Sequence, residues 1–239
     1  MQTRWHPSDS EQAWLAAALA FVGRAEREAL AARGVFHVVL AGGNTPRSVY
    51  QALARERHDW PRWQVWFGDE RCLPVDHPER NSVMARAALL DHDFARNPAM
   101  HPIPGELGAR AAAHAYAEEL AGVPTFDLVL LGLGEDGHTA SLFPGYTAGA
   151  EADVLAVFDA PKPPPERVSL SASRLSRARQ VLFLVSGAGK RAALRRWRAG
   201  EHAFSTNSAF STIPAAAIQP EAGVDVLLAP DLSTSGVFP

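Results

Sequence analysis

Short apolar runs alternate with longer amphipathic stretches along most of the chain. The runs have the length of buried strands, and the stretches between them carry apolar residues at helical spacing. Strands are expected at 35–41, 63–70, 126–134, 153–159, 167–173 and 181–186, and helices at about 10–32, 81–91, 109–122 and after the glycine turns at 42 and 187. This alternation predicts an α/β fold with a parallel-dominated sheet and helices on both faces.

Local signals mark the ends of two of these helices. Ser8 and Glu11 have the spacing of a capping box at the start of the first helix, and Gly34 is expected to end it. Thr45 is the expected N-cap of the second helix, with Pro46 at its first position because the proline ring suits that place. Both helices would therefore begin directly after a turn.

The composition is that of an ordinary globular protein. The 239 residues are 47% hydrophobic, so we expect a single domain over 1–239, with a small lobe at about 140–175 as an option. The net charge of −3 gives no indication of a nucleic-acid partner. One cysteine, Cys72, excludes an internal disulfide and a cysteine-based zinc site.

The start of the chain does not have the pattern of a targeting segment. The first twenty residues have neither the basic start nor the continuous apolar stretch of a signal peptide. No window approaches the roughly 18 uninterrupted apolar residues of a membrane span. We therefore expect a cytoplasmic protein without a membrane partner. The sequence leaves the oligomeric state open, and a monomer is our expectation.

Four of the expected strands end in polar or glycine-rich loops, and ligands of parallel α/β sheets bind at such ends. The first loop, AGGNTP, contains Gly42, Gly43, Asn44 and Thr45. Its glycines would let the backbone approach a ligand, and the helix N-terminus that follows suits a phosphate. A plain strand-to-helix turn explains the same residues, and the Gly-Lys-Ser/Thr ending of a P-loop is missing.

Other candidates in these loops carry charge. Asp69 and Arg71 lie in GDERC at a strand end, where Arg71 could bind an anion or stabilise an oxyanion and Asp69 could orient a partner. Lys190 lies at the start of a helix and Arg167 at the start of a strand, and both could hold a phosphate. Solvated surface charge is the competing explanation.

His138 lies in the most unusual of these loops, LLGLGEDGHTASLFPG. A histidine can take and give protons near neutral pH, and Asp136, two positions earlier, could fix its tautomer. A nucleophile arrangement with Ser141 is conceivable, although Ser141 lacks the G-x-S-x-G elbow. A loop histidine without any chemistry is the competing explanation.

Metal and dinucleotide sites find little support. The nine histidines show neither H-x-x-x-H nor H-E-x-x-H spacing, so we expect no metal. The stretch GLGEDG matches the G-x-G-x-x-G pattern and follows a strand. The segment after it lacks the apolar helix and the clear acidic strand end that a dinucleotide site needs. We therefore expect no cofactor.

The order and spacing of five segments are more specific than any one of them. The segments are LAGGNTPRSVYQAL, FGDERCLPVDHPERNS, FDLVLLGLGEDGHTASLFPG, PKPPPERVSLSAS and VLFLVSGAGKRAAL. With them the chain resembles the 6-phosphogluconolactonase family over nearly its whole length. The resemblance implies a three-layer α/β/α fold with a mostly parallel, Rossmann-like sheet of the sugar-phosphate isomerase/deaminase type.

The resemblance also implies an activity and a set of roles. The reaction would be the hydrolysis of 6-phospho-D-glucono-1,5-lactone in the oxidative pentose phosphate pathway, without a cofactor. His138 would be the general base that activates water, oriented by Asp136 or by Asp69. Arg71 would serve either the phosphate or the oxyanion. The residues that would hold this phosphosugar lactone are Gly42, Gly43, Asn44, Thr45, Arg167 and Lys190.

Two other functions remain open at this point. Glucosamine-6-phosphate deaminases share the fold and a similar histidine loop, but they carry an acid after the histidine, whereas TASLFPG follows His138. Their counterpart of GDER typically ends in tyrosine, where this chain has Arg71. A sugar-phosphate-binding protein without turnover would need the cations but neither His138 nor Asp136. The pattern favours the lactonase over both.

Overall fold

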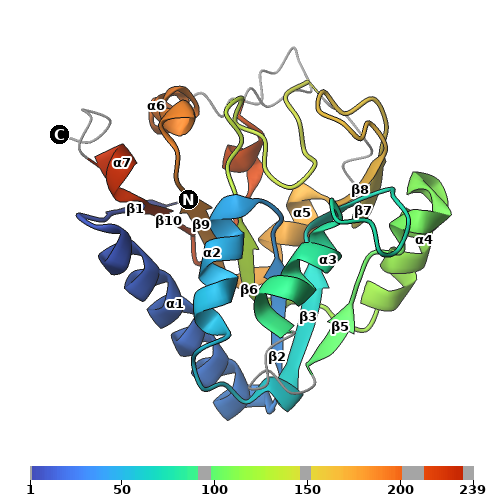
Figure 1. Cartoon of the computed structure of the whole chain (residues 1–239), viewed down its shortest axis with the longest axis horizontal. Coiled ribbons are helices and arrows are strands. Elements are labelled where there is room, and N and C mark those ends of the chain that lie inside the picture. The colour runs from blue at the N-terminus through green and yellow to red at the C-terminus, as the bar shows by residue number, and fades with distance from the viewer. Residues whose placement is uncertain (1, 91–97, 146–151, 201–212, 234–239) are drawn as a thin grey trace.

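Seven parallel strands form the central sheet of the computed structural model, which describes residues 2–90, 98–145, 152–200 and 213–233. Their order is β1-β10-β9-β6-β2-β3-β5, and helices cover both faces of the sheet, as predicted (Figure 1). The strands are β1 (Thr3–Pro7), β2 (Phe36–Leu40), β3 (Trp63–Phe67), β5 (Ala99–His101), β6 (Phe126–Leu131), β9 (Ala178–Val185) and β10 (Val224–Leu228).

A second, antiparallel sheet has the strand order β4-β8-β7. Its strands are β4 (Asp69–Arg71), β7 (Val154–Val157) and β8 (Arg167–Leu170). Two of them come from the segment 140–175, in which the sequence analysis considered a small lobe. Residues 146–151 of that segment lie outside the described residues.

The expectation of one strand over 63–70 is wrong, because this stretch contributes to both sheets. Gly68 separates the two strands. Its N–H donates to the carbonyl of Leu40 in the central sheet (3.0 Å), and its own carbonyl accepts from Leu170 in the second sheet (2.8 Å). Each hydrogen bond satisfies a polar backbone group at the crossing point. Asp69 and Arg71 therefore belong to the second sheet.

The helices fill the connections between strands, and α1 and α2 lie side by side (Figure 1). The α-helices are α1 (Glu11–Arg33), α2 (Asn44–Leu53), α3 (Asn81–Ala85), α4 (Ala109–Leu120), α5 (Ala172–Ser176), α6 (Arg191–Arg198) and α7 (Pro230–Ser233). Helix α3 continues as one π-helical turn over Arg86–Leu90. Residue 91, the expected end of that helix, lies outside the described residues.

Two of the expected helix ends need correction. The N-cap of α1 is Ser10, whose hydroxyl accepts from the N–H of Ala13, and not Ser8. The N-cap of α2 is Gly43 with φ +101°, so Thr45 lies inside the first turn of that helix. Gly34 ends α1 in the left-handed conformation, as predicted.

The two edge strands were not predicted. β1 (TRWHP) is mostly half-buried and carries an arginine and a histidine, and β5 has only three residues. An edge strand contacts the core less completely than a central one, so it does not need a continuous apolar run. By contrast, all six residues of β6, at the centre of the sheet, are buried. The apolar pattern therefore predicts the central strands of this sheet but not its edge strands.

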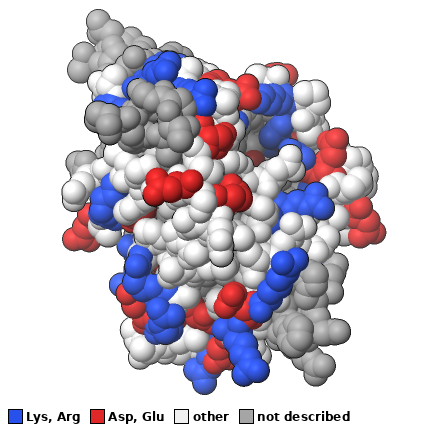
Figure 2. All heavy atoms as spheres, turned by 60° about the vertical axis from the view of Figure 1, so that its left-hand side comes forward, with Lys and Arg blue, Asp and Glu red and all other residues white. Residues whose placement is uncertain are grey.

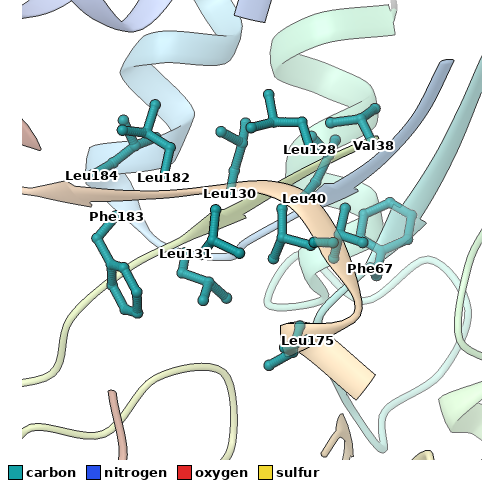
Figure 3. Packing of buried hydrophobic residues seen from close by; sticks show 14 of the residues in the cluster. Val38, Leu40, Phe67, Leu128, Leu130, Leu131, Leu175, Leu182, Phe183 and Leu184 are labelled. Atoms are coloured by element: carbon teal, nitrogen blue, oxygen red, sulfur yellow. The ribbon is translucent and has the colours of Figure 1, made fainter. Parts of the chain in front are cut away.

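The core lies on both faces of the central sheet. Side chains of β9 alternate between the faces, with Leu182 and Leu184 on one and Phe183 on the other (Figure 3). Leu130 and Leu131 of β6 alternate in the same way (Figure 3). All five are at most 1% exposed. A strand that is buried on both faces needs apolar residues at every position, which explains the continuous run at 126–131.

Buried Glu26 joins α1 to the start of β3. Its carboxylate accepts hydrogen bonds from the Trp63 indole (2.8 Å) and the Asp59 N–H (2.9 Å), and it lies 2.5 Å from Nδ1 of His58. Burial raises the pKa of Glu26, but these partners outweigh burial and leave that pKa below its usual value. The charged form of Glu26 therefore stabilises the fold.

Glu26→Gln is expected to lower the free energy of unfolding near neutral pH by roughly 1.5–3 kcal/mol, the range for hydrogen bonds to a charged group. Because folding lowers the pKa of Glu26, its contribution is present above the unfolded pKa of about 4.3 and is lost as the pH falls through the folded value. Urea unfolding at neutral and acid pH measures the effect, with Glu28→Gln on the exposed side of α1 as the control. An equal deficit at both pH values would contradict a role for the charge.

The strand order brings the candidate loops together. β9, β6, β2 and β3 are consecutive in the sheet, and all run parallel. The chain leaves β2 toward β3 on one side and later forms β6 on the other side, which makes the crevice between β2 and β6 a topological switch point. The four loops of interest, at 41–46, 68–72, 132–145 and 186–191, follow these four strands.

Candidate functional site

A cavity of about 430 Å³ opens where these loops meet. All four loops and the Pro-rich turn before β8 contribute to its wall. The site residues predicted from the sequence that line it are Gly42, Gly43, Asn44, Thr45, Asp69, Arg71, His138, Arg167 and Lys190. Asp136 does not line the cavity but contacts His138 from behind. The fold therefore brings all ten predicted residues to one place.

The imidazole of His138 is held by Asp136. Nδ1 lies 2.5 Å from Oδ1 of Asp136, which also accepts the backbone N–H of His138 (3.1 Å). Burial raises the pKa of Asp136, but the backbone N–H and the imidazole of His138 outweigh it and hold that pKa below its usual value. No residue of the described part of the chain hydrogen-bonds to Nε2 of His138. That nitrogen can therefore act on a ligand in the cavity.

Backbone hydrogen bonds fold the His138 loop back on itself. The N–H of Gly134 donates to the carbonyl of His138 (2.7 Å), and the N–H of Gly137, with φ +90°, donates to the carbonyl of Gly134 (3.1 Å). The Thr139 hydroxyl donates to the carbonyl of Gly132 (2.8 Å). Gly134 is required for space, because a Cβ at this position would lie 2.0 Å from Nδ1 of His138.

Gly134→Ala is therefore expected to displace the imidazole and to lower kcat by about 10²-fold, the cost of roughly 1 Å of misplacement. Gly132→Ala is the matched control, because it adds the same methyl group to the same loop and meets nothing within 4 Å. Steady-state kinetics would compare the two on the phosphosugar lactone that the family resemblance implies as substrate. Equal kcat values for both variants would show that the space beside Nδ1 is not critical.

The Asp69 carboxylate accepts hydrogen bonds from groups other than the His138 imidazole. Its Oδ2 accepts the Ser141 hydroxyl (2.7 Å), and its Oδ1 accepts the Asn81 amide (3.0 Å). Ser141 is completely buried and does not line the cavity, so its hydroxyl is not available as a nucleophile. Of the two acids considered as partners of His138, only Asp136 is in contact with it among the described residues.

The loop after β2 forms one wall of the cavity through its two glycines. A Cβ on Gly42 would lie 2.0 Å from Oδ1 of Asn81, so Gly42 leaves room for that amide. Gly43 has φ +101°, which favours glycine. Thr45 is tied to the loop after β9 by a 2.7 Å hydrogen bond with the Ser186 hydroxyl. The loop therefore packs against Asn81 at Gly42 and is hydrogen-bonded to Ser186 at Thr45.

Two arginines face each other in the second sheet. Arg71 on β4 and Arg167 on β8 are directly opposite in the antiparallel register, and both line the cavity. Like charges at opposite positions repel, so the pair favours an anion between or beside them. Burial lowers the pKa of Arg167, and the charge of Asp69 partly opposes this shift.

Arg167 also organises the Pro-rich turn. Its guanidinium donates to the carbonyls of Pro164 (3.0 Å), Lys162 (2.9 Å) and Pro163 (3.2 Å). The turn carries Lys162 to the rim of the cavity, which Lys190 also lines. Burial lowers the pKa of Lys190, which the neighbouring Glu135 partly offsets. Among the described residues, the cavity wall therefore contains four cationic side chains.

Sequence reasoning missed several polar residues in this wall, two of which carry an amide or a charge. Asn81 and Lys162 line the cavity, although neither was among the candidates. Both lie inside segments that carried the family resemblance, FGDERCLPVDHPERNS and PKPPPERVSLSAS. The signal was therefore present, but an asparagine after a charged stretch and a lysine among prolines are both typical of exposed loops.

Other features of the described residues limit what the site can hold. No three of their histidine, cysteine or acidic side chains lie close enough to hold a metal ion. None of the helices formed by these residues is both long and apolar enough to cross a membrane. Basic and acidic side chains are mixed over the face that Figure 2 shows. The absence of a cofactor and of a nucleic-acid partner stays a prediction.

Comparison with known proteins finds a family model and sequence relatives that agree with one another. A family model described as glucosamine-6-phosphate isomerases/6-phosphogluconolactonase matches residues 9–227. The chain is 41% identical to a 6-phosphogluconolactonase of Synechocystis sp. over 203 residues, which are 81% of this chain and 82% of the relative. It is 43% identical to a 6-phosphogluconolactonase of Streptomyces coelicolor over 183 residues, which are 68% of this chain and 70% of the relative.

Solved structures show the same architecture. The 6-phosphogluconolactonase of Thermotoga maritima matches with a TM-score of 0.84 at 25% identity, covering 95% of this chain and all of that one. A monomeric glucosamine-6-phosphate deaminase matches with a TM-score of 0.80 at 19% identity, covering 98% and 99%. This second match reflects the fold alone. The family model and the sequence relatives together show that the chain belongs to the glucosamine-6-phosphate isomerase/6-phosphogluconolactonase family.

Proposed function

We propose that this protein hydrolyses 6-phospho-D-glucono-1,5-lactone to 6-phosphogluconate, as a 6-phosphogluconolactonase of the oxidative pentose phosphate pathway. The proposal is carried by the contact between Nδ1 of His138 and Asp136, beside a cavity with cationic walls. No described residue hydrogen-bonds to Nε2 of His138. Relatives at 41% and 43% identity have this name. A lactone is an activated ester, so a base, a phosphate anchor and stabilisation of an oxyanion are sufficient.

In the proposed mechanism His138 acts first as a base and then as an acid. Nε2 takes a proton from water as the water oxygen attacks C1 of the lactone. The carbonyl oxygen becomes the oxyanion of a tetrahedral intermediate. The bond between C1 and the ring oxygen then breaks, and protonated His138 gives its proton to the departing oxygen. Acid–base catalysis of this kind contributes about 10²–10⁴-fold.

Asp136 supports this cycle without leaving its charged form. Its carboxylate accepts from Nδ1–H, which places the lone pair of the neutral imidazole on Nε2, on the side of the cavity. When His138 becomes an imidazolium, the same carboxylate stabilises the positive charge. The lowered pKa of Asp136 is consistent with this role, because the carboxylate remains ionised across the neutral range.

We assign binding of the substrate phosphate to cationic side chains of the cavity wall. Arg71 and Arg167 face each other on two strands, and we assign the substrate phosphate to this pair, with Lys190 as a further anchor. The loop residues Gly42 and Gly43 bring backbone close to the sugar. This assignment places Arg71 with the phosphate, and it leaves the oxyanion to other donors in the wall.

The deaminase alternative has a direct test. The fold does not discriminate between the two activities, because a deaminase matches it almost as closely as a lactonase does. Acid release from freshly made lactone should exceed the spontaneous rate, which must be subtracted, while glucosamine 6-phosphate should release no ammonia. The opposite pattern would assign the chain to the deaminases. Neither activity, combined with tight binding of 6-phosphogluconate, would indicate a binding protein without turnover.

The cellular setting is part of the proposal. We expect a cytoplasmic monomer whose partner is the small-molecule substrate. Relatives in the same family have names that place them elsewhere, including an endoplasmic bifunctional protein of Oryctolagus cuniculus and a probable chloroplastic lactonase of Oryza sativa. Location is therefore not a property of the family, and fractionation of cells that express the full protein would determine it.

A further inference from the structure

Asn81 is a buried amide in the wall of the cavity with no role in the mechanism above. It is the first residue of α3 and only 6% exposed, yet it lines the cavity between the loop after β2 and the start of β4. Its Nδ2 donates to two oxygens of Asp69, the backbone carbonyl (2.9 Å) and Oδ1 (3.0 Å). Both partners are acceptors, so they determine which end of the amide is nitrogen.

The opposite end of the amide is therefore an oxygen. Oδ1 of Asn81 lies against the loop after β2, where a Cβ on Gly42 would be only 2.0 Å away. No donor in the described part of the chain reaches Oδ1. Some described polar atoms lack a partner and are completely buried, but Oδ1 of Asn81 is not among them. It is an acceptor on a residue of the cavity wall, and no described residue donates a hydrogen bond to it.

Glu70 holds Asn81 rigidly in this position. The Glu70 carboxylate is completely buried and accepts the backbone N–H of Asn81 (2.7 Å) and of Arg71 (2.9 Å) on one oxygen. Its other oxygen accepts both the N–H (2.9 Å) and the hydroxyl (2.7 Å) of Ser82. Asn81 is therefore fixed at its backbone by one carboxylate and at its side chain by another. A group held this firmly is preorganised for recognition.

We propose that Oδ1 of Asn81 accepts a hydrogen bond from one ring hydroxyl of the bound phospholactone, at C2, C3 or C4, and so contributes to specificity for the sugar. The inference rests on the proposed function. Its physical basis is that a buried acceptor left without a donor is costly, so a substrate that lacks the hydroxyl is rejected. The cationic side chains proposed to bind the phosphate cannot distinguish substrates that differ in a ring hydroxyl, because they would contact only the phosphate.

The test compares the parent lactone with its 2-deoxy, 3-deoxy and 4-deoxy analogues, each carrying the 6-phosphate. For the wild-type protein, kcat/KM is expected to fall by about 10- to 100-fold for one analogue in particular. In Asn81→Ala the acceptor is gone, so that analogue and the parent lactone should be hydrolysed with nearly equal kcat/KM. Thermal unfolding of the variant checks that it is folded.

Ser141→Ala is the control for an indirect effect through Asp69. It removes the other side-chain partner of Asp69 but does not alter the cavity wall, so it should change kcat/KM for all four lactones by one common factor. A wild-type protein that hydrolyses all four lactones equally well would overturn the inference alone, even if the alanine variant fails to fold. A wild-type protein that hydrolyses none of them would overturn the proposed function, and the inference with it.

Discussion

His138→Asn is expected to lower kcat by at least about 10²-fold, with only a modest change in KM. Asparagine keeps a polar group beside Asp136 but cannot accept a proton from water. The proposed phosphate anchors Arg71 and Arg167 are untouched, so binding of the substrate should persist. The measurement is acid release from freshly prepared lactone, with the spontaneous rate subtracted, because an inactive variant otherwise resembles a weakly active one.

A surface histidine provides the matched control for this substitution. His114 on α4 has a side chain that is 79% exposed and is not part of the cavity wall, so His114→Asn should leave kcat unchanged. If calorimetry shows that the His138→Asn variant still binds 6-phosphogluconate, its cavity is intact. A kcat close to that of the wild type would exclude His138 as the base, and the role of Asp136 would fall with it.

Arg71→Met is expected to raise KM for the phosphorylated lactone by about 10- to 100-fold, which is the loss of one or two hydrogen bonds between charged groups. Arg71 lies opposite Arg167 in the second sheet, on strands that do not carry His138. Its charge should therefore act on the phosphate and not on the reacting carbon. The corresponding prediction is that kcat changes little.

Glucono-1,5-lactone, which has no phosphate, separates the two roles considered for Arg71. If Arg71 binds the phosphate, Arg71→Met should hydrolyse this substrate as well as the wild type does. Arg47→Met on the exposed side of α2 is the control for general loss of positive charge near the site. A fall in kcat of similar size on both lactones would instead assign Arg71 to the oxyanion.

Much of the fold follows from local patterns in the sequence. The run FDLVLL at 126–131 is apolar at every position because β6 is covered on both faces, and this continuity is visible without any structure. Glycine turns after β2 and β9 mark where helices begin. The edge strand β1 was not predicted, because a half-exposed strand does not need a continuous apolar run.

The departure of β4 from the central sheet was also beyond local reasoning. Residues 63–70 are a plausible single strand, and the crossing at Gly68 depends on hydrogen bonds to Leu40 and Leu170, which are distant in the chain. This crossing has a consequence for the site. It places Arg71 opposite Arg167, a pairing that only the antiparallel register decides.

The sequence pattern, together with the family resemblance, predicts the α/β class, the loops that form the site, and the ten residues that line or support the cavity. It left open which acid holds His138, because Asp136 lies on the same loop and Asp69 lies at the end of another expected strand. In the folded protein Asp136 contacts Nδ1 of His138, whereas Asp69 accepts hydrogen bonds from Ser141 and Asn81. The physical reason is that local patterns report burial and turns, whereas partners across loops depend on how distant segments pack.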